Sequence, residues 1–269
     1  MKFENIYLHI ISEMNYKIIK EDIEQNYKLA AEDFVNEYNE IYNEKGMNAI
    51  VNSDGTIDVD GSIEPSVIGV NYLSKLIKHV GNNECVLAVK FNKVTGNFNC
   101  SNLRLINLAG CPSYVGGNFD CSYNKLTNLE NCPQTINGNF NCSVQDNYNF
   151  SFVGGPVSVN GNFICHHYYQ MNSTEGCPQN VKGECILDIQ SGINTINDYP
   201  KYCKKLYITI GKNDDVRKSM FSDIKKLKRI VKYPIEINDM KKTDVPMQPD
   251  EYSNPYDSDN YAAGDSENY

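Results

Sequence analysis

The sequence contains no tryptophan and no apolar run near the roughly 20 residues that a membrane-spanning helix needs. The first residues also lack the continuous apolar segment of a secretory signal, because Glu4, His9 and Glu13 interrupt the apolar side chains. Overall apolar content is ordinary, with 41% hydrophobic residues, so a core can form. These features predict an intracellular protein with no membrane partner.

Basic charge is also scarce. The chain has 25 basic and 34 acidic residues, which gives a formal net charge of -9. Much of the excess is local, because positions 247 to 269 contain six acidic residues and no basic residue. The remaining charges nearly balance, so we expect no surface that neutralises phosphates and no nucleic-acid partner.

The common catalytic and metal-binding motifs are missing. No phosphate-binding loop, dinucleotide fingerprint, zinc-protease motif or nucleophile elbow occurs, and the ten cysteines include no Cys-x2-Cys pair. Asp54, Asp58 and Asp60 suggest a calcium loop, but one with Gly61 at its sixth position would have Val67 where a bidentate Glu is required. The sequence therefore predicts no catalytic residues, no metal and no cofactor.

What the chain does have is an internal repeat. A Gly-Asn-Phe-x-Cys segment begins at Gly96, and its glycine recurs at positions 117, 138, 161 and, in a degraded copy, 183. The steps are 21, 21, 23 and 22 residues. A unit this short cannot bury its apolar side alone and stacks on copies of itself. The period therefore predicts a solenoid.

The second unit shows how each copy would fold. Phe119 and Cys121 lie two residues apart and face one side of a strand, whereas Asn118, Asp120 and Ser122 face the other. Stacked copies predict a parallel sheet along one side of the solenoid, followed in each unit by a turn or a short helical return. The expected buried columns are Phe98, Phe119, Phe140 and Phe163, and Cys100, Cys121, Cys142 and Cys165.

The cysteines are expected to be buried free thiols. Their spacing places equivalent residues in lines along a solenoid, whereas tetrahedral zinc needs ligands that converge on one point. Parallel side chains on adjacent coils are poorly aimed for a disulfide. Free cysteine behaves as a small buried hydrophobe, so packing in the core is the favoured interpretation.

The spacing Phe119-x-Cys121-x2-Asn124-x-Leu126 resembles the leucine-rich-repeat pattern Leu-x-Leu-x2-Asn-x-Leu. The longer segment that begins at Gly117, GNFDCSYNKLTNLENCP, is more closely similar to a repeat in tailed-bacteriophage proteins. This resemblance covers about residues 56 to 210 and implies a solenoid, but it carries almost no information on function. Leu103 and Gln145 stand where Asn124 does, so the sequence predicts no unbroken asparagine ladder.

The rest of the chain surrounds the repeat. Helical spacing of apolar residues predicts two helices, or one kinked helix, within residues 3–14 and 16–43, and a further helix over 66–80. Strands are expected at 206–210 and 235–237. Asp214 or Asp215 begins a predicted helix that caps the open end of the stack. We expect an α+β protein with these parts: 1–46, an N-terminal helical segment; 47–95, a first cap; 96–210, the leucine-rich-repeat-like solenoid; 211–239, a C-terminal cap; 240–269, a disordered acidic, tyrosine-rich tail.

The solvent-exposed side of the predicted sheet is the candidate binding surface. Its short polar side chains can recognise a protein partner, as such faces do in repeat proteins. Those side chains also keep an exposed sheet soluble, and the absence of large aromatic or arginine anchors argues against tight binding. The predicted surface comprises Asn97, Asn99, Ser101, Asn118, Asp120, Ser122, Asn139, Asn141, Ser143, Asn162, Ile164 and His166.

These observations, with the phage resemblance, predict a non-enzymatic, phage-encoded repeat protein that binds another protein of the phage or its host. It would act in the host cytoplasm or in the virion. A second hypothesis is a virion or packaging component, because the start MKFENIY resembles the amino ends of several phage structural proteins. The segment Ile11-Ser12-Glu13 also resembles the cleavage site of some prohead proteases.

A third, enzymatic hypothesis rests on Cys165, His166 and His167, the one cluster of soft ligands where the repeat also loosens. Neighbouring strand residues point to opposite faces, so Cys165 is expected inside and His166 outside. In that arrangement His166 does not serve the thiol as a base. A degenerate repeat with surface histidines is the favoured interpretation.

Overall fold

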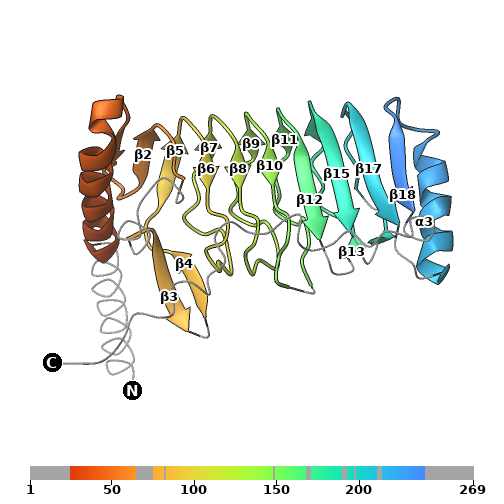
Figure 1. Ribbon diagram of the computed structural model, residues 1–269, viewed down its shortest axis with the longest axis horizontal. Helices are drawn as coiled ribbons and strands as arrows, with labels where there is room; N and C mark the ends of the chain where they lie inside the picture. Colours follow the sequence, from red (N-terminus) through yellow and green to blue (C-terminus); the bar gives the residue numbers. More distant parts are fainter. Residues whose placement is uncertain are drawn as a thin grey trace, which may run out of the picture.

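The structure is a computed structural model that describes residues 25–64, 75–81, 83–147, 149–167, 171–189, 193–196, 198–210 and 214–239. These residues form a β-solenoid with a helix at each end (Figure 1). The first helix covers residues 25–42 and the last, α3, spans Asp214–Leu227. The predicted α+β solenoid with terminal helices is therefore confirmed. The predicted helix within 3–14 and the predicted disorder of 240–269 lie outside the described residues.

Each coil between residues 91 and 189 contributes one strand to each of two sheets, whereas the sequence predicted one sheet. Sheet A has the strand order β1 (Asn48–Val51), β2 (Ile57–Asp60), β5 (Phe91–Val94), β7 (Tyr114–Val115), β9 (Thr135–Ile136), β11 (Ser158–Val159) and β14 (Asn180–Val181). Sheet B has the order β6 (Phe98–Asn99), β8 (Phe119–Asp120), β10 (Phe140–Asn141), β12 (Phe163–His167), β15 (Glu184–Ile189), β17 (Lys205–Ile210) and β18 (Ile235–Asp239). Strand pairing in these sheets is parallel except between β1 and β2.

A sharp corner joins the two strands of each coil, and glycine makes it possible. Gly117 and Gly138 stack at this corner, where a Cβ atom on Gly138 would lie 2.7 Å from the carbonyl carbon of Gly117. Real Cβ contacts are not this close, so any larger residue would push two coils apart. The recurring glycine of the repeat therefore marks a place where neighbouring backbones approach too closely for a side chain.

The core fills the space enclosed by the two sheets and the loops. The rings of Phe98, Phe119, Phe140 and Phe163 are fully buried and stack with successive centroid distances of 5.7, 5.5 and 5.5 Å. Cys100, Cys121, Cys142 and Cys165 are also fully buried, so both predicted columns are confirmed. In the next coil Cys185 pairs with Phe163, and Leu187 pairs with Cys165. The facing side chains from sheet A are Val94, Val115, Ile136, Val159 and Val181.

The return from sheet B to sheet A consists of bends and turns, one of the two forms that the sequence left open. In the second unit Leu126 and Leu129 point into the core and are fully buried. Tyr123, three residues after the end of β8, has a φ of 54°, which lets the chain turn away from the sheet. A small additional parallel pair, β13 (Met171–Ser173) and β16 (Ile193–Thr195), lies in the later returns.

The first cap includes the helix over 25–42, a 3-10 turn (Asn43–Lys45) and the antiparallel pair of β1 and β2. Phe34 and Tyr38 of the helix are fully buried, and the ring of Phe34 meets the edge of Phe91 at 5.3 Å. The helix thereby closes one end of the core. Its described part begins at residue 25, within the predicted range 16–43.

The predicted helix over 66–80 is wrong at its end. Residues 77–81 form β3 (Ile77–Gly81), which pairs antiparallel with β4 (Glu84–Leu87), whereas residues 65–74 lie outside the described residues. The apolar spacing at Leu76, Ile77 and Val80 fits a helix, but residues 77–81 pair with the following segment and form a strand instead. A left-handed residue, Asn83 with a φ of 61°, lies in the tight connection.

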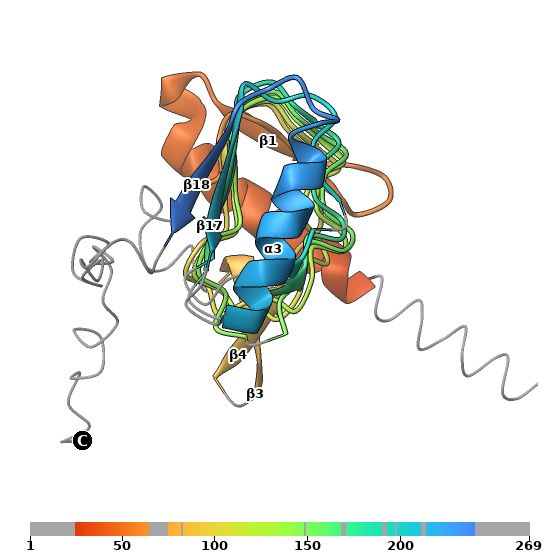
Figure 2. The ribbon, with the colours of Figure 1, turned by 90° about the vertical axis from the view of Figure 1, so that its right-hand side faces the viewer.

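The C-terminal cap follows the prediction. The strands β17 and β18 precede and follow α3 in the sequence. Figure 2 looks onto α3 where it covers the C-terminal end of the solenoid. Met220, Ile224 and Leu227 are buried, whereas Phe221 is 40% exposed and Ile230 is 65% exposed. Among the described residues, no helix is both long enough and apolar enough to cross a bilayer.

Candidate binding face of sheet B

Four of the twelve predicted surface residues lie at the corner between the sheets. The amide oxygens of Asn97, Asn118, Asn139 and Asn162 each accept a backbone N–H of the next coil at 2.8 Å. These asparagines therefore join successive coils. The sequence places them on the solvent-exposed face because they are polar, but each precedes its strand by one residue and has a backbone partner.

A second group lies on the outer face of sheet B and is bonded mainly within its own coil, with one link between coils from Asn141 Nδ2 to Asp120 Oδ2 at 3.1 Å. The carboxamide or carboxylate oxygens of Asn99, Asp120 and Asn141 accept the N–H of Ser101, Ser122 and Ser143, at 2.9, 2.9 and 3.1 Å. Such local bonds compete with strand pairing and end these strands after two residues.

The serines of this group offer little to a partner. Ser122 and Ser143 are buried, and each hydroxyl donates to the preceding acidic or amide side chain at 2.6 Å. The N-terminal half of the face is therefore largely occupied with its own hydrogen bonds.

The C-terminal half of the face differs in shape and chemistry. Ile164 and Ile186 replace the Asn or Asp of the earlier coils, so β12 and β15 continue for five and six residues. Strand register places Ile164, Ile186 and Tyr207 side by side on β12, β15 and β17, and all three are half-buried. We call these three residues the apolar row.

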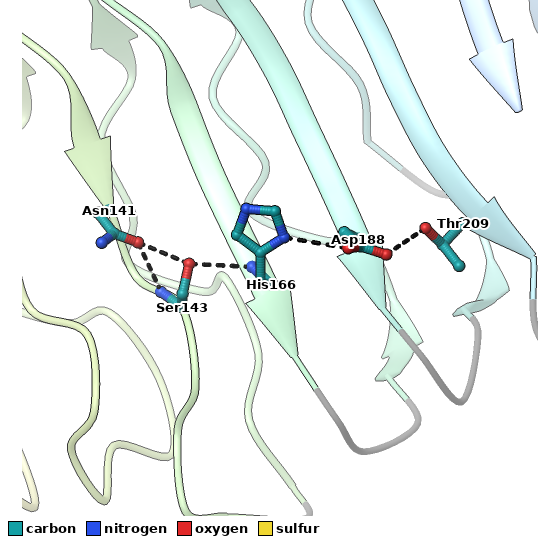
Figure 3. A network of polar contacts seen from close by, with 5 residues as sticks. All are labelled: Asn141, Ser143, His166, Asp188 and Thr209. Carbon is teal, nitrogen blue, oxygen red and sulfur yellow. Dashed lines mark hydrogen bonds and ion pairs between the residues drawn. The ribbon is translucent and has the colours of Figure 1, made fainter. Parts of the chain in front are cut away.

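A polar row runs beside the apolar row and is shown in Figure 3: Ser143, His166, Asp188 and Thr209. The hydroxyl of Ser143 accepts the backbone N–H of His166 at 3.0 Å, and His166 Nδ1 lies 3.1 Å from Asp188 Oδ2. Thr209 donates its hydroxyl to the other oxygen of Asp188. The hydrogen bond from His166 is the main cause that lowers the pKa of Asp188. The row thus links four coils.

Lys205 borders the apolar row on its other side. Its ammonium group pairs with Glu236 on β18, donates a hydrogen bond to the Tyr207 hydroxyl at 2.8 Å and lies 4.2 Å from the centroid of the Tyr207 ring. These contacts raise the pKa of Lys205. They also hold the Tyr207 ring in one orientation on the face.

The cluster at Cys165, His166 and His167 does not assemble a nucleophile and a base. Cys165 points into the core and is fully buried, whereas His166 points outward to Asp188. His167 points inward and is 2% exposed, and burial lowers its pKa to about 4. Within the described ranges, no group of three or more His, Cys, Asp or Glu residues is arranged to hold a metal ion.

All ten cysteines are free thiols, and nine of them are buried. Burial raises the pKa of Cys132 and of the partly buried Cys203 to about 12, and it raises the pKa of Cys121 and Cys142 well above the ordinary value. The thiolate is the reactive form of cysteine, so we expect these thiols to react slowly in the folded chain.

Comparison of the chain with models of protein families, with curated proteins and with solved structures gave no match. Inferences about function therefore rest on the arrangement of side chains on the outer face of sheet B.

Sequence reasoning missed half of this face. It included Ile164 and His166 but not Ile186, Asp188, Tyr207 or Thr209, because the repeat motif degrades after the fourth unit. The alternation of outward and inward residues in Glu184–Ile189 and Lys205–Ile210 is the signal that identifies them.

Proposed function

We propose that this chain is a non-enzymatic repeat protein that binds another protein through the outer face of sheet B, centred on the apolar row. The supporting observation is the change along this face, from polar residues that are already hydrogen-bonded to neighbouring groups to two isoleucines and a tyrosine on longer strands. Tyrosine is a frequent anchor in protein interfaces, so Tyr207 supplies what the predicted polar surface lacked.

The surroundings of the apolar row fit a protein partner. Interfaces commonly combine an apolar centre with a polar rim. The rim here consists of the half-buried His166 and Asp188 on one side and Lys205 with Glu236 on the other. Both charge signs occur close together, which suits a mixed peptide surface better than a uniformly charged polymer. The side chains of the rim are held in place by their mutual contacts, so little ordering remains to be done on binding.

The test is partner capture by the full-length chain carrying Ile164→Lys and Ile186→Lys. Two lysines on the apolar row should reduce affinity for the captured partner at least about tenfold, which corresponds to about 1.4 kcal/mol. The matched control is Tyr114→Lys with Thr135→Lys, which adds the same charge to the exposed side of sheet A. Circular dichroism should be unchanged in both variants. Equal capture by the apolar-row variant and the unmodified chain would exclude this face as the interface.

We also propose that the protein is phage-encoded and acts in the host cytoplasm or in the virion. The support is the similarity of the Gly-Asn-Phe-x-Cys repeat to repeats in tailed-bacteriophage proteins. Peptide mass spectrometry of purified particles separates the two locations. Peptides of this chain at a fixed ratio to the capsid protein would place it in the virion, and their absence would place it in the infected cell.

A further inference from the structure

The outward side of the C-terminal cap carries a concentration of positive charge that the fold does not need. The helix α3 turns Met220, Ile224 and Leu227 toward the core, and its outer side faces solvent at the C-terminal end of the solenoid (Figure 2). Five exposed cations lie on this side and in the turn that follows the helix. They are Lys218, Lys225, Lys228, Arg229 and Lys232, and we call them the basic cap surface.

Within the described part of the chain, none of these five cations is in an ion pair. Two neighbouring cations are paired: Lys226 lies 3.0 Å from Asp223, and Arg217 binds Asp239. The helix dipole accounts for Lys225 in the last turn but not for Lys218 near the start, where a positive charge is unfavourable. Crowding like charges on a cap costs stability, so an anionic occupant is the expected counterpart.

The chain supplies an anionic segment that follows the last described residue, Asp239, after three residues in the sequence. Residues 243–269, outside the described residues, contain seven acidic residues and no basic residue, together with four tyrosines. The last described strand, β18, ends at Asp239, and the carboxylate of Asp239 accepts two hydrogen bonds from Arg217 in the first part of α3, at 2.6 and 3.0 Å. The last described residue before this segment therefore contacts α3.

The acidic segment 243–269 is long enough to cover the basic cap surface. The 14-residue helix is about 21 Å long, at 1.5 Å per residue. A flexible chain of this segment's length has a root-mean-square end-to-end distance of roughly 30 Å. Tethering at Asp239 also gives the acidic side chains an effective concentration in roughly the millimolar range at the helix. Phe221, 40% exposed beside Lys218 and Lys225, offers an apolar contact for a tyrosine.

We propose that the acidic segment 243–269 docks on the basic cap surface of its own chain. The contact is electrostatic, with carboxylates against the five cations and tyrosine rings near Phe221. It covers the end of the solenoid and leaves the outer face of sheet B to the partner. It does not depend on the proposed function, because the two surfaces share no residue.

Zero-length carbodiimide cross-linking of the full chain, followed by mass spectrometry, tests the proposal. Cross-links should join the carboxylates of residues 250–267 to Lys218, Lys225, Lys228 and Lys232, and raising the salt concentration to 0.5 M should reduce them severalfold. Mixing labelled and unlabelled chains identifies links within one molecule. Links mainly between molecules, or spread equally over Lys28, Lys45 and Lys78 at the other end, would overturn the proposal.

Two full-length variants sharpen the result. Reversing Lys218, Lys225 and Lys228 to Glu should abolish the links to Lys232, whereas reversing Lys28, Lys45 and Lys78 to Glu should leave them unchanged. Replacing Asp250, Glu251, Asp257 and Asp259 with their amides changes no residue of the solenoid and should increase retention on an immobilised polyanion, because the basic surface becomes free. Unchanged retention of this variant would also overturn the proposal.

Discussion

Asn124 and Gln145 occupy equivalent places in successive coils, and each places a buried amide against the backbone of the coil before it. Asn124 Oδ1 accepts the N–H of Leu105 at 3.0 Å, and Gln145 Oε1 accepts the N–H of Leu126 at 3.1 Å. The amide nitrogen of each donates to a carbonyl of the preceding coil at 2.9 Å. The longer glutamine thus performs the task of the asparagine, and a break in the sequence pattern is not a break in the structure.

We expect Asn124→Ala to lower the free energy of unfolding by at least about 3 kcal/mol, because four buried backbone groups lose a partner at roughly 1–3 kcal/mol each. Asn124→Gln should cost less, since Gln145 shows that the longer amide fits. Asn118→Ala, at an exposed corner with one backbone hydrogen bond, should cost no more than about 1 kcal/mol. Urea denaturation measures all three, and equal losses for Asn124→Ala and Asn118→Ala would contradict the expectation.

Phe140 lies between the rings of Phe119 and Phe163 in the middle of the core. Phe140→Ala removes a fully buried aromatic ring and should cost about 3–5 kcal/mol. Phe221→Ala, on the exposed side of α3, is the control and should cost less than about 1 kcal/mol. Thermal unfolding followed by circular dichroism distinguishes them, and a small loss at Phe140 would mean that the ring column contributes little.

His167 should make stability depend on pH. Burial lowers its pKa from 6.5 to about 4, so between these values the unfolded chain binds a proton that the folded chain does not. Stability therefore falls as the pH drops from about 6.5 to about 4, by roughly 3 kcal/mol at the 1.36 kcal/mol that each pKa unit represents. Below that range this contribution stays constant.

Urea denaturation at pH 7.0 and pH 4.5 measures the effect. His167→Phe should remove most of the loss, because the buried position then has no group to protonate. His79→Gln changes an exposed histidine and should retain the loss. An unchanged pH profile in His167→Phe would assign the acid sensitivity to other groups.

The thiols should be hidden from reagents in the folded chain. Nine of the ten are buried, and burial raises the pKa of Cys132 and Cys203 to about 12. At pH 8 we expect no fast reaction of the native chain with Ellman's reagent. After denaturation in guanidinium, all ten thiols of the chain should react. Several thiols that react within seconds in the native chain would show that the coils open readily.

The sequence predicts those parts of the fold in which residues of the same type recur at a regular spacing. Phe119 and Cys121 alternate with polar residues and recur at a fixed step, so their burial and stacking follow directly. The helix α3 was predictable from its apolar stripe and from Asp214 at its start. Sheet A was not, because strands of two residues such as Tyr114–Val115 are too short to show an alternation.

The candidate site was predicted only in part because polarity does not reveal whether a side chain is already bonded. Asn118 and Asp120 appear equally exposed in the sequence, yet one joins two coils and the other ends a strand. Ile186 and Tyr207 lie where the motif has degraded, and strand register is needed to place them beside Ile164. Pairing with the following segment, which the apolar spacing does not reveal, likewise determines that residues 77–81 form a strand.

The stacked glycines at the corner also determine how such a molecule can change in length. Duplicating one whole unit recreates the same glycine-on-glycine contact, so coils can be gained or lost as complete copies. A shift of one residue would instead place a side chain in that contact. Gly138 and Gly161 are 23 residues apart and not 21, which shows that extra residues are accommodated in the loops between corners. The geometry of the corner is therefore the same in every such unit, and differences in unit length occur in the loops.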